Sequence, residues 1–593
     1  MSGGNEDQAD APAAPRPRRR MFLAVLAALG VAAVLVAALA AGYWGGQHDA
    51  LPKIQSRIIA PMLNRVTGAD ELQDAQTISW ETMHTHLHTL DIARITLSPR
   101  ATPAIWALAQ AGDNILFVSR LGQFGYLDAA NHLTTLDLKV DMGLEALRRS
   151  GLYDDPIFQL SEVRTFDLLS VPSGANSYDL YASHHRFEEA GRCFQMVVSR
   201  TRIETGPDGV RVVSPAWEDI YVARPCIPIK NIGMRLAGHE GGGRLALLNA
   251  ETLLFSIGTH QFDGITSPPD QVYGQDSETD LGKIIEISIR NHTGRIFARG
   301  MRNPQGLLID SGGRIWETEH GPKGGDEVNL IRRGGNYGWP TVTYGLEYGS
   351  PPLPWPYSPH QGRQDGFDTP RFAFVPSIGA SNIIEPNDAE FPDWSTHLLM
   401  ASLHGNTLFA LKTEGDAITY AEPIAMGERM RDMISLSDGR IAIVTDSAKL
   451  ILIRNADRHE GDPRSFVVTG LTGLAPPQPD EAMPTTPEIY GNRMFFYYCG
   501  NCHTTTGEAK AGPPLNGVLG REIGSVEGYP YSDALAGASG RWTRTRLRAF
   551  LNHSDARLGG TTMPPVSLYD DEFNGIFHYL RTTQATPTTP AAP

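Results

Sequence analysis

The sequence predicts a mainly β protein: a six-bladed β-propeller with an N-terminal transmembrane helix and a C-terminal all-α domain. Three observations favour this fold class. Residues 21–43 carry no charged side chain, six short apolar strand patterns recur between residues 115 and 444, and residues 499–503 read Cys-Gly-Asn-Cys-His. A chain of 593 residues has room for more than one folded domain.

The uncharged segment 21–43 predicts a membrane anchor. Its 23 residues would form a helix about 34 Å long, enough to cross the hydrocarbon core of a bilayer. Residues 1–20 form a basic tail, which the positive-inside rule keeps in the cytoplasm. A signal peptide cleaved after Ala38-Leu39-Ala40 is the alternative, but the apolar run exceeds the usual length of about 7 to 15 residues. Residues 44–81 then form a connecting segment outside the cytoplasm.

Repeated strand patterns predict the propeller between residues 82 and 455. Several apolar runs follow Gly-Asp, Gly-Gly or Asp-Gly turns, and most precede a second strand such as residues 283–287 or 449–453. Runs that start about 43 to 83 residues apart suit four-stranded blades with variable insertions. A large β-sandwich is the alternative fold, but it would not explain six similar units. The six runs are residues 115–118, 194–198, 253–257, 315–317, 398–400 and 441–444.

The C-x-x-C-H segment is the attachment signature of a covalently bound c-type haem. Cys499 and Cys502 would form the thioether bonds, and the adjacent His503 would bind the iron. Met563, within the sequence Thr-Thr-Met-Pro-Pro, is the candidate for the second axial ligand. A thioredoxin-like dithiol and half of a zinc site are the alternatives, and a zinc site would need a second pair of Cys or His residues nearby.

The residues around this motif carry a resemblance. Residues 512–521, residues 528–535 and Trp542 resemble a mitochondrial-type class I cytochrome c. The resemblance implies an all-α cytochrome c domain over residues 487–582, with the histidine and methionine named above as axial ligands. Independently, the apolar spacing within residues 573–580 predicts a helix.

Two segments flank this domain. Residues 456–486 are rich in proline and would form a linker that is stiffer than a glycine-serine chain. Residues 583–593 alternate threonine, proline and alanine and are expected to be disordered.

Charge and cysteine content restrict partners and compartment. A formal net charge of -15 argues against a nucleic-acid partner, because contact with phosphates needs a basic face. Besides the haem cysteines, the chain has Cys193 and Cys226, whose spacing fits either a disulfide or two separate thiols. Covalent haem in an exported chain indicates the bacterial periplasm, with the protein held at the inner membrane by a single span.

A second resemblance concerns the propeller. Residues 299–307, 319–322, 326–330 and 334–340 together resemble the family of PQQ-dependent soluble glucose dehydrogenases and aldose sugar dehydrogenases. This resemblance implies a six-bladed propeller that binds pyrroloquinoline quinone (PQQ) and calcium on its axis and oxidises a sugar hydroxyl.

The resemblance assigns roles to individual residues. His239 matches the catalytic histidine, and an imidazole that titrates near neutrality suits removal of a hydroxyl proton. Arg302 and Asn303 match the pair that faces the quinone carbonyls, where a guanidinium would stabilise developing negative charge. Arg429 and Arg431 match a second cluster, which contacts the carboxylates of PQQ.

The same resemblance implies a calcium site. The backbone carbonyls of Gly321 and Pro322 match calcium-contacting positions, and the carboxylates of Asp326 and Glu327 also suit a hard cation.

Two positions depart from the family pattern. Gly238 stands where the family has an aspartate beside the catalytic histidine, so another group must orient the imidazole. His404 aligns with a lysine that contacts the cofactor, so a permanent cation is missing from a site for a triply anionic ligand.

The sequence thus predicts a membrane-anchored quinohaemoprotein. A sugar or related alcohol would be oxidised with PQQ, and haem c would pass the electrons to a periplasmic or respiratory-chain acceptor. A dehydrogenase for a non-sugar alcohol or aldehyde is one alternative. The other is a propeller without PQQ that serves as a docking module for the cytochrome.

Overall fold

The computed structural model describes residues 74–97, 105–150, 163–228, 240–265, 267–347, 354–358, 360–471, 491, 495, 499–500, 502–552, 563 and 570–583. The chain divides into two compact units, Met1–Asp74 and Ala75–Pro593. The predicted membrane anchor, residues 21–43, lies outside the described residues. Within the described ranges, no helix combines the length and the apolar character that a membrane span requires.

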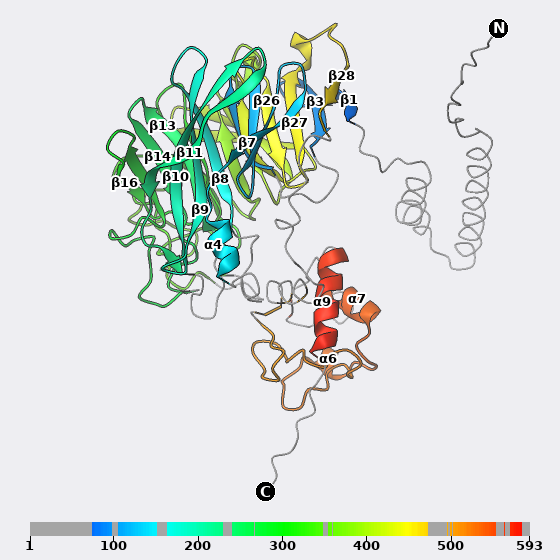
Figure 1. Cartoon of the computed structure of the whole chain (residues 1–593). Helices are drawn as coiled ribbons and strands as arrows, with labels where there is room; N and C mark the ends of the chain where they lie inside the picture. The colour runs from blue at the N-terminus through cyan, green and yellow to red at the C-terminus, as the bar shows by residue number, and fades with distance from the viewer. Residues whose placement is uncertain are drawn as a thin grey trace, which may run out of the picture. The chain divides into compact units, whose positions relative to one another are not determined.

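Six antiparallel sheets form the blades of a propeller, which confirms the six-bladed propeller part of the predicted fold (Figure 1). Each blade has four strands, and two blades carry a fifth. The first blade has β4 (Ile105–Ala111), β5 (Asn114–Ser119), β6 (Gln123–Leu127) and β7 (Leu133–Lys139), and the second β8 (Thr165–Pro172), β9 (Ser177–Glu188), β10 (Cys193–Gly206), β11 (Gly209–Val222) and β12 (Ile227–Pro228). The third has β13 (Gly242–Asn249), β14 (Thr252–Ile257), β15 (Lys283–Ser288) and β16 (Thr293–Arg299).

The remaining three blades follow the same order. The fourth has β17 (Pro304–Ile309), β18 (Ile315–Glu319), β19 (Asp326–Ile331) and β20 (Phe372–Phe374). The fifth has β21 (Ala380–Ile384), β22 (His397–Ser402), β23 (Thr407–Glu414) and β24 (Ala417–Ala425). The sixth has β25 (Met430–Ser435), β26 (Ile441–Thr445) and β27 (Lys449–Asn455), completed by β3 (Thr89–Thr96) and β2 (Glu81–His84).

The first strand of each blade contacts the first strands of both neighbouring blades. β4 contacts β8, and the contacts continue through β13, β17, β21 and β25 back to β4. These six strands therefore surround the axis. Because every blade repeats the same strand order, the residues that precede the first strands meet at one end of the ring.

The six apolar runs found in the sequence fall in six different sheets. Five of them lie in the second strand of a blade, and residues 194–198 lie in β10, the third strand of its blade. The second strand there, β9, contains the buried polar residues Ser183, His184 and His185. A search for apolar runs therefore passes over it.

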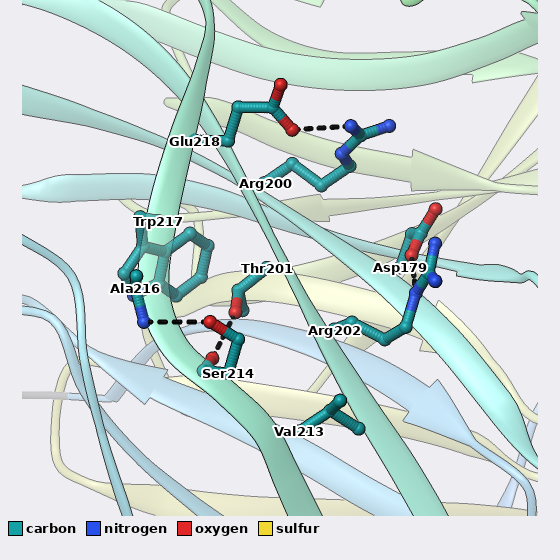
Figure 2. A pocket seen from close by; sticks show the side chains of 9 residues that line it. All are labelled: Asp179, Arg200, Thr201, Arg202, Val213, Ser214, Ala216, Trp217 and Glu218. Carbon is teal, nitrogen blue, oxygen red and sulfur yellow. Dashed lines mark hydrogen bonds and ion pairs between the residues drawn. The ribbon is translucent and has the colours of Figure 1, made fainter.

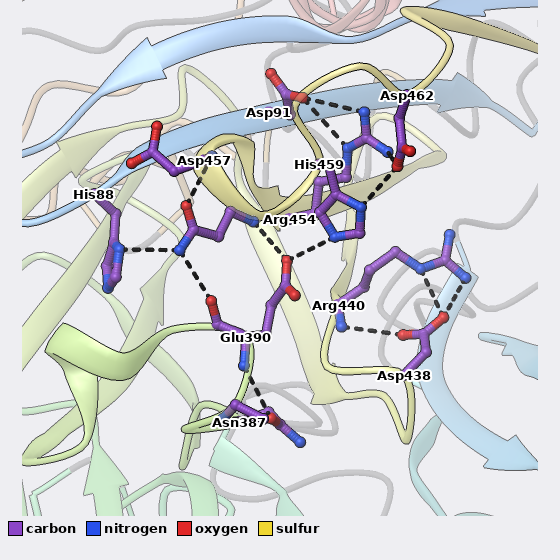
Figure 3. A network of polar contacts seen from close by, with 12 residues as sticks. His88, Asp91, Asn387, Glu390, Asp438, Arg440, Arg454, Asp457, His459 and Asp462 are labelled. Atoms are coloured by element: carbon purple, nitrogen blue, oxygen red, sulfur yellow. Dashed lines mark hydrogen bonds and ion pairs between the residues drawn. The ribbon is translucent and has the colours of Figure 1, made fainter.

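Strands from the two ends of the propeller sequence close the ring. β3 pairs antiparallel with β27, and Asp91 of β3 lies opposite Arg454. The fully buried Asp91 carboxylate accepts a hydrogen bond from Arg454 at 3.2 Å (Figure 3). It accepts another from Arg464 at 2.6 Å. Burial acts to raise the pKa of Asp91, but these hydrogen bonds outweigh it and bring the pKa below its ordinary value.

The closure network continues into the fifth blade. His459 contacts Glu390 at 3.1 Å and Asp462 at 2.8 Å, and Asn455 donates from its amide nitrogen to the Glu390 carbonyl at 3.0 Å (Figure 3). The short 3-10 helices η5 (Pro392–Trp394) and η6 (Ala456–Arg458) border this network. β27 is therefore joined to β3 by strand pairing and to the fifth blade by polar contacts.

Two strands extend beyond the six blades. β1 (Ala75–Ser79) pairs antiparallel with β28 (Ser465–Thr469). These strands lie in the stretches that the sequence assigned to the connecting segment and to the linker. A short helix, α4 (Leu144–Arg149), follows the first blade.

Cys193 and Cys226 form a disulfide whose Cα atoms are 5.7 Å apart. The two thiols left open by the sequence are therefore paired. The bond joins the start of β10 to the residue before β12, and β12 also pairs with β10 through Ile227 and Phe194. This anchors the chain directly before residues 229–239, which lie outside the described residues.

The described part of the C-terminal domain contains the helices α6 (Asp533–Ala536), α7 (Arg544–Asn552) and α9 (Asp570–Thr582). α9 includes the predicted helix over residues 573–580, and its buried side chains Phe573, Ile576 and Leu580 pack with Cys499 in one apolar cluster. A Cβ atom on Gly491 would lie 1.9 Å from the Gly575 carbonyl oxygen, so the two segments cross with glycine at the contact.

Candidate functional site

The candidate site lies where the first strands of the blades begin. Arg164 precedes β8, Glu240 precedes β13 by one residue, Arg302 and Asn303 precede β17, and Arg429 precedes β25. Because these strands surround the axis, segments far apart in the sequence meet there. The ring explains why the family motifs are scattered along the chain.

The Arg302 guanidinium is held by hydrogen bonds and by an aromatic ring. Its Nη2 atom donates to the Glu240 carboxylate at 2.6 Å, and its Nη1 atom donates to the carbonyls of His320 and Gly321 at 3.0 Å each. The guanidinium also lies 5.2 Å from the ring centre of Trp339, a cation–π contact. With 7% of the residue exposed, Arg302 is a buried and oriented positive charge.

Asn303 shares a hydrogen-bond network with His320. The Asn303 amide nitrogen lies 3.3 Å from His320 Nδ1, and the Asn303 side-chain oxygen accepts from Gln305 at 2.8 Å. Burial lowers the pKa of His320, Asp326 opposes this shift, and the guanidiniums of Arg302 and Arg431 add to it. Burial and the two nearby guanidinium charges therefore both favour the neutral form of the imidazole.

Arg429 and Arg431 share one carboxylate. Both donate to Asp446, Arg429 through Nε at 2.9 Å and Arg431 through Nη2 at 2.9 Å. Burial lowers the pKa of Arg431 to about 10, although Asp446 opposes the shift. Arg429 also donates to the Leu403 carbonyl at 3.3 Å, which places it beside the exposed His404. The structure thus brings together the residues predicted to contact the PQQ carboxylates.

Three glutamates of β18 and β19 are buried near Arg302. Glu319 faces Glu327 across β18 and β19, and its carboxylate accepts from the backbone nitrogens of Arg302 at 2.6 Å and Asn303 at 3.2 Å. Burial raises the pKa of Glu319 to about 7 against these hydrogen bonds. Burial and the charge of Glu319 raise the pKa values of Glu317 and Glu327 well above the ordinary range.

The residues predicted to bind calcium have other partners in this structure. The Gly321 carbonyl accepts from Arg302, which leaves it a second lone pair, and Pro322 is buried beside it. Asp326 is saturated: its two oxygens accept from five donors and so are not free for a cation. The donors are Gly321 N, Ser377 Oγ, Ile378 N, Gly379 N and Ala380 N. In the described part of the chain, no three His, Cys, Asp or Glu side chains are grouped to hold a metal ion.

The predicted base, His239, lies outside the described residues, as does Gly238. The next residue, Glu240, is described and is 6% exposed. Glu240, Arg164 and His320 were not predicted from the sequence. Glu240 had a signal, since it adjoins the predicted base, whereas the place of Arg164 before β8 is known only from the structure.

The haem motif has the groups that a covalent haem needs. Cys499 and Cys502 are free thiols, not a disulfide. His503 Nδ1 lies 2.7 Å from the Pro513 carbonyl oxygen, so this nitrogen carries the proton and Nε2 is left to bind iron. A Cβ atom on Gly512 would lie 2.2 Å from the His503 ring, which only glycine permits. Met563 packs against the apolar cluster that contains Cys499.

A separate surface pocket lies on the long strands of the second blade (Figure 2). There, Arg200 pairs with Glu218 at 2.5 Å and Arg202 pairs with Asp179 at 2.7 Å, beside Trp217 (Figure 2). The pocket has a volume of about 400 Å³ and contains none of the predicted site residues. Its charges are balanced, and we assign the chemistry to the axial site.

Comparison with known proteins agrees with this architecture. The sequence profile of the family described as Glucose / Sorbosone dehydrogenase matches residues 165–454. The aldose sugar dehydrogenase YliI of Escherichia coli is 29% identical over 233 residues, which are 37% of this chain and 61% of that protein. The crystal structure of the soluble E. coli aldose sugar dehydrogenase in its apo form has a TM-score of 0.50 and 22% identity, and the match covers 61% of this chain and 99% of that one.

The C-terminal region matches a different group of proteins. The cytochrome c-type cyt cy of Rhodobacter capsulatus is 38% identical over 105 residues, 17% of this chain and 52% of that protein. The chain therefore spans about three fifths of the propeller relative and about half of the cytochrome relative.

Proposed function

We propose that this chain, whose propeller belongs to the glucose/sorbosone dehydrogenase family and whose C-terminal region is related to cytochromes c, is a PQQ-dependent quinohaemoprotein dehydrogenase. It oxidises an aldose or a related alcohol and passes the electrons to its own haem c. One observation carries the proposal: a single chain combines converging guanidiniums at the propeller axis with two free thiols and a fixed histidine in a haem motif.

The donor set at the axis fits a planar, triply anionic cofactor. Three guanidiniums lie there, and their direct ion-pair partners are two carboxylates, Glu240 and Asp446. When bound, PQQ would accept the hydride from the sugar carbon, which carries the two electrons of the oxidation. Arg429 and Arg431, beside His404, would hold its carboxylates.

The chain's own residues prepare the rest of the reaction. His239 would take the proton of the sugar hydroxyl as a general base. Arg302, oriented before the substrate arrives, would stabilise the negative charge that develops on the cofactor oxygens, with Asn303 as a second donor. Calcium at the carbonyls of Gly321 and Pro322 remains part of the proposal, and Asp326 is not one of its ligands.

Location is a further part of the proposal. Residues 21–43 would anchor the protein once in the bacterial inner membrane, with the propeller and the haem domain in the periplasm, where the haem meets its electron acceptor. The uncharged length of this segment supports the assignment. Replacement of residues 1–43 by a cleavable signal peptide should move the protein from the membrane fraction to the soluble periplasmic fraction.

The direct test combines the purified oxidised protein with PQQ, calcium and a panel of aldoses, without added dye. The α-band of the haem should rise only when PQQ and a sugar are both present. If no sugar reduces the haem and PQQ does not bind, the propeller is a docking module, and the departures at Gly238 and His404 mark a lost cofactor site.

A further inference from the structure

We infer that Glu240 is a positioning residue for the proposed reaction: its carboxylate fixes the orientation of the Arg302 guanidinium. The inference rests on the proposed function. It assigns a role to a residue that directly follows the predicted base in the sequence and lies against the predicted electrophile in the fold.

The Glu240 carboxylate has three donors. Arg302 Nη2 lies 2.6 Å from Oε1, while Thr259 Oγ1 and Gln261 N lie 3.0 and 3.2 Å from Oε2. A carboxylate engaged by three donors is held in one orientation and is poorly suited to accept a substrate proton. Its role is therefore to hold its neighbours in place.

A hydrogen bond and close packing also fix the main chain of Glu240. Its carbonyl accepts from His260 N at 3.0 Å. A Cβ atom on Gly258 would lie 1.9 Å from the same carbonyl oxygen, so the turn after β14 packs directly against it. The carboxylate of Glu240 therefore extends from a main chain that is itself fixed in position.

Arg302 receives its orientation from this arrangement. Thr259 binds both partners, donating from Oγ1 to Glu240 and from its backbone nitrogen to the Arg302 carbonyl at 2.9 Å. A buried ion pair that loses one partner leaves an uncompensated charge, which then moves or recruits water. Glu240 thus keeps the guanidinium aimed at one place before the reaction begins.

Glu240 also supplies a carboxylate next to the predicted base, where Gly238 departs from the family pattern. The family pattern has a carboxylate directly before the catalytic histidine, and this chain has one directly after it. The charge is retained but is directed toward Arg302.

The test compares Glu240→Gln with Glu240→Asp, and uses Glu251→Gln, an exposed glutamate of the same blade, as the matched control. We expect Glu240→Gln to lower kcat for sugar-driven dye reduction by about 10- to 100-fold, with KM changed by less than about threefold. The second readout is PQQ binding to the apo-protein, followed by absorption titration. Removing a negative charge beside an anionic cofactor should leave this affinity unchanged or higher. Glu240→Asp should recover part of the rate.

Each outcome decides the inference. A Glu240→Gln protein with wild-type kcat overturns it. So does a protein in which kcat, PQQ affinity and the unfolding temperature fall together, because that pattern indicates a purely structural role. If Glu240→Gln does not fold, Glu240→Asp decides: lowered kcat with unchanged PQQ affinity supports the role, and any other result contradicts it. A wild-type protein that oxidises no sugar refutes the proposed function itself, whereas an active wild type beside an unaffected variant refutes only the role of Glu240.

Discussion

At the scale of single residues, Arg302 shows what a motif can and cannot predict. The sequence pattern identified it as a charge beside the cofactor, because arginine in that motif matches the family. Its partner, Glu240, lies 62 residues away, and only the closed ring of first strands brings the two together. The spacing of the two residues in the sequence does not predict that contact.

The predicted base gives the first test at this scale. His239→Ala should abolish sugar-driven haem reduction, because no other group is assigned to take the hydroxyl proton, and should leave the haem spectrum unchanged. The measurement is the haem absorption spectrum with and without sugar. Haem reduction at the wild-type rate would exclude His239 as the base.

Met563→Ala tests the haem domain, in contrast to His239→Ala, which tests the propeller. Loss of the thioether should change the ligation of the iron and lower its reduction potential, and it should leave dye-linked sugar oxidation largely intact. Redox titration together with a dye assay separates the two domains. An unchanged potential would mean that another residue supplies the sixth ligand.

Glu319 gives a pH-dependent test. Its pKa in the folded protein, about 7, exceeds its ordinary value of 4.5 because burial disfavours the charge. The folded state therefore binds the proton more tightly than the unfolded state does. This contribution to stability is complete below pH 4.5 and is lost as the pH rises through 7.

Glu319→Gln removes this titration. The wild-type protein should lose up to about 3 kcal/mol of stability relative to the variant between pH 4.5 and pH 8, at about 1.4 kcal/mol per pKa unit. Urea unfolding of both proteins across this range measures the difference. A constant difference would show that Glu319 is ionised throughout.

At the scale of elements, strand periodicity predicted the propeller but not its closure. The apolar runs mark one strand in each of the six sheets, since those strands are buried on both faces. The pairing of β3 with β27 joins residues more than 350 positions apart, and it depends on Asp91, Arg454 and Arg464, whose charges resemble surface residues in the sequence.

Asp91→Asn should weaken this closure. The change removes the negative charge that two guanidiniums share, at a cost of about 1–3 kcal/mol. We expect a lower unfolding temperature and faster proteolysis before β3. Asp438→Asn is the control, because its ion pair with Arg440 is largely exposed and should change stability by less than about 1 kcal/mol. Equal effects of the two substitutions would refute a special role for the closure.

At the scale of the whole molecule, one arginine links the blades at the axis. Arg244 of β13 donates to Asp167 of β8 at 3.0 Å and to Asp432 of β25 at 2.6 Å. It also donates to the Gln305 carbonyl of β17 at 2.6 Å. Burial raises the pKa of Asp167 to about 6, against the attraction of Arg244. Four blades therefore depend on one buried charge.

Arg244→Met should destabilise the propeller by about 3–5 kcal/mol, because two buried carboxylates lose their shared cation. Arg363→Met, which breaks an exposed ion pair with Asp365, is the control. Thermal unfolding of the propeller measures both. An Arg244→Met protein as stable as the control would contradict a structural role for this shared cation.

The limits of the sequence become clear at this scale. The haem motif was readable because the two attachment cysteines and the histidine are adjacent in the chain, and the structure adds the fixed histidine and the free thiols. The axial site was only partly readable. The pairing of Glu240 with Arg302, like the Arg244 network, exists only where separate blades meet, whereas Asp446 pairs with Arg429 and Arg431 within the sixth blade.

The central claim is that one chain oxidises sugar and reduces its own haem. The most direct measurement is the rate of haem reduction after rapid mixing of the PQQ- and calcium-loaded protein with excess aldose, at several protein concentrations. Our account predicts a first-order rate that does not depend on protein concentration, because the acceptor is tethered to the propeller. A rate that rises with protein concentration, or the absence of haem reduction while an external dye is reduced, would contradict it.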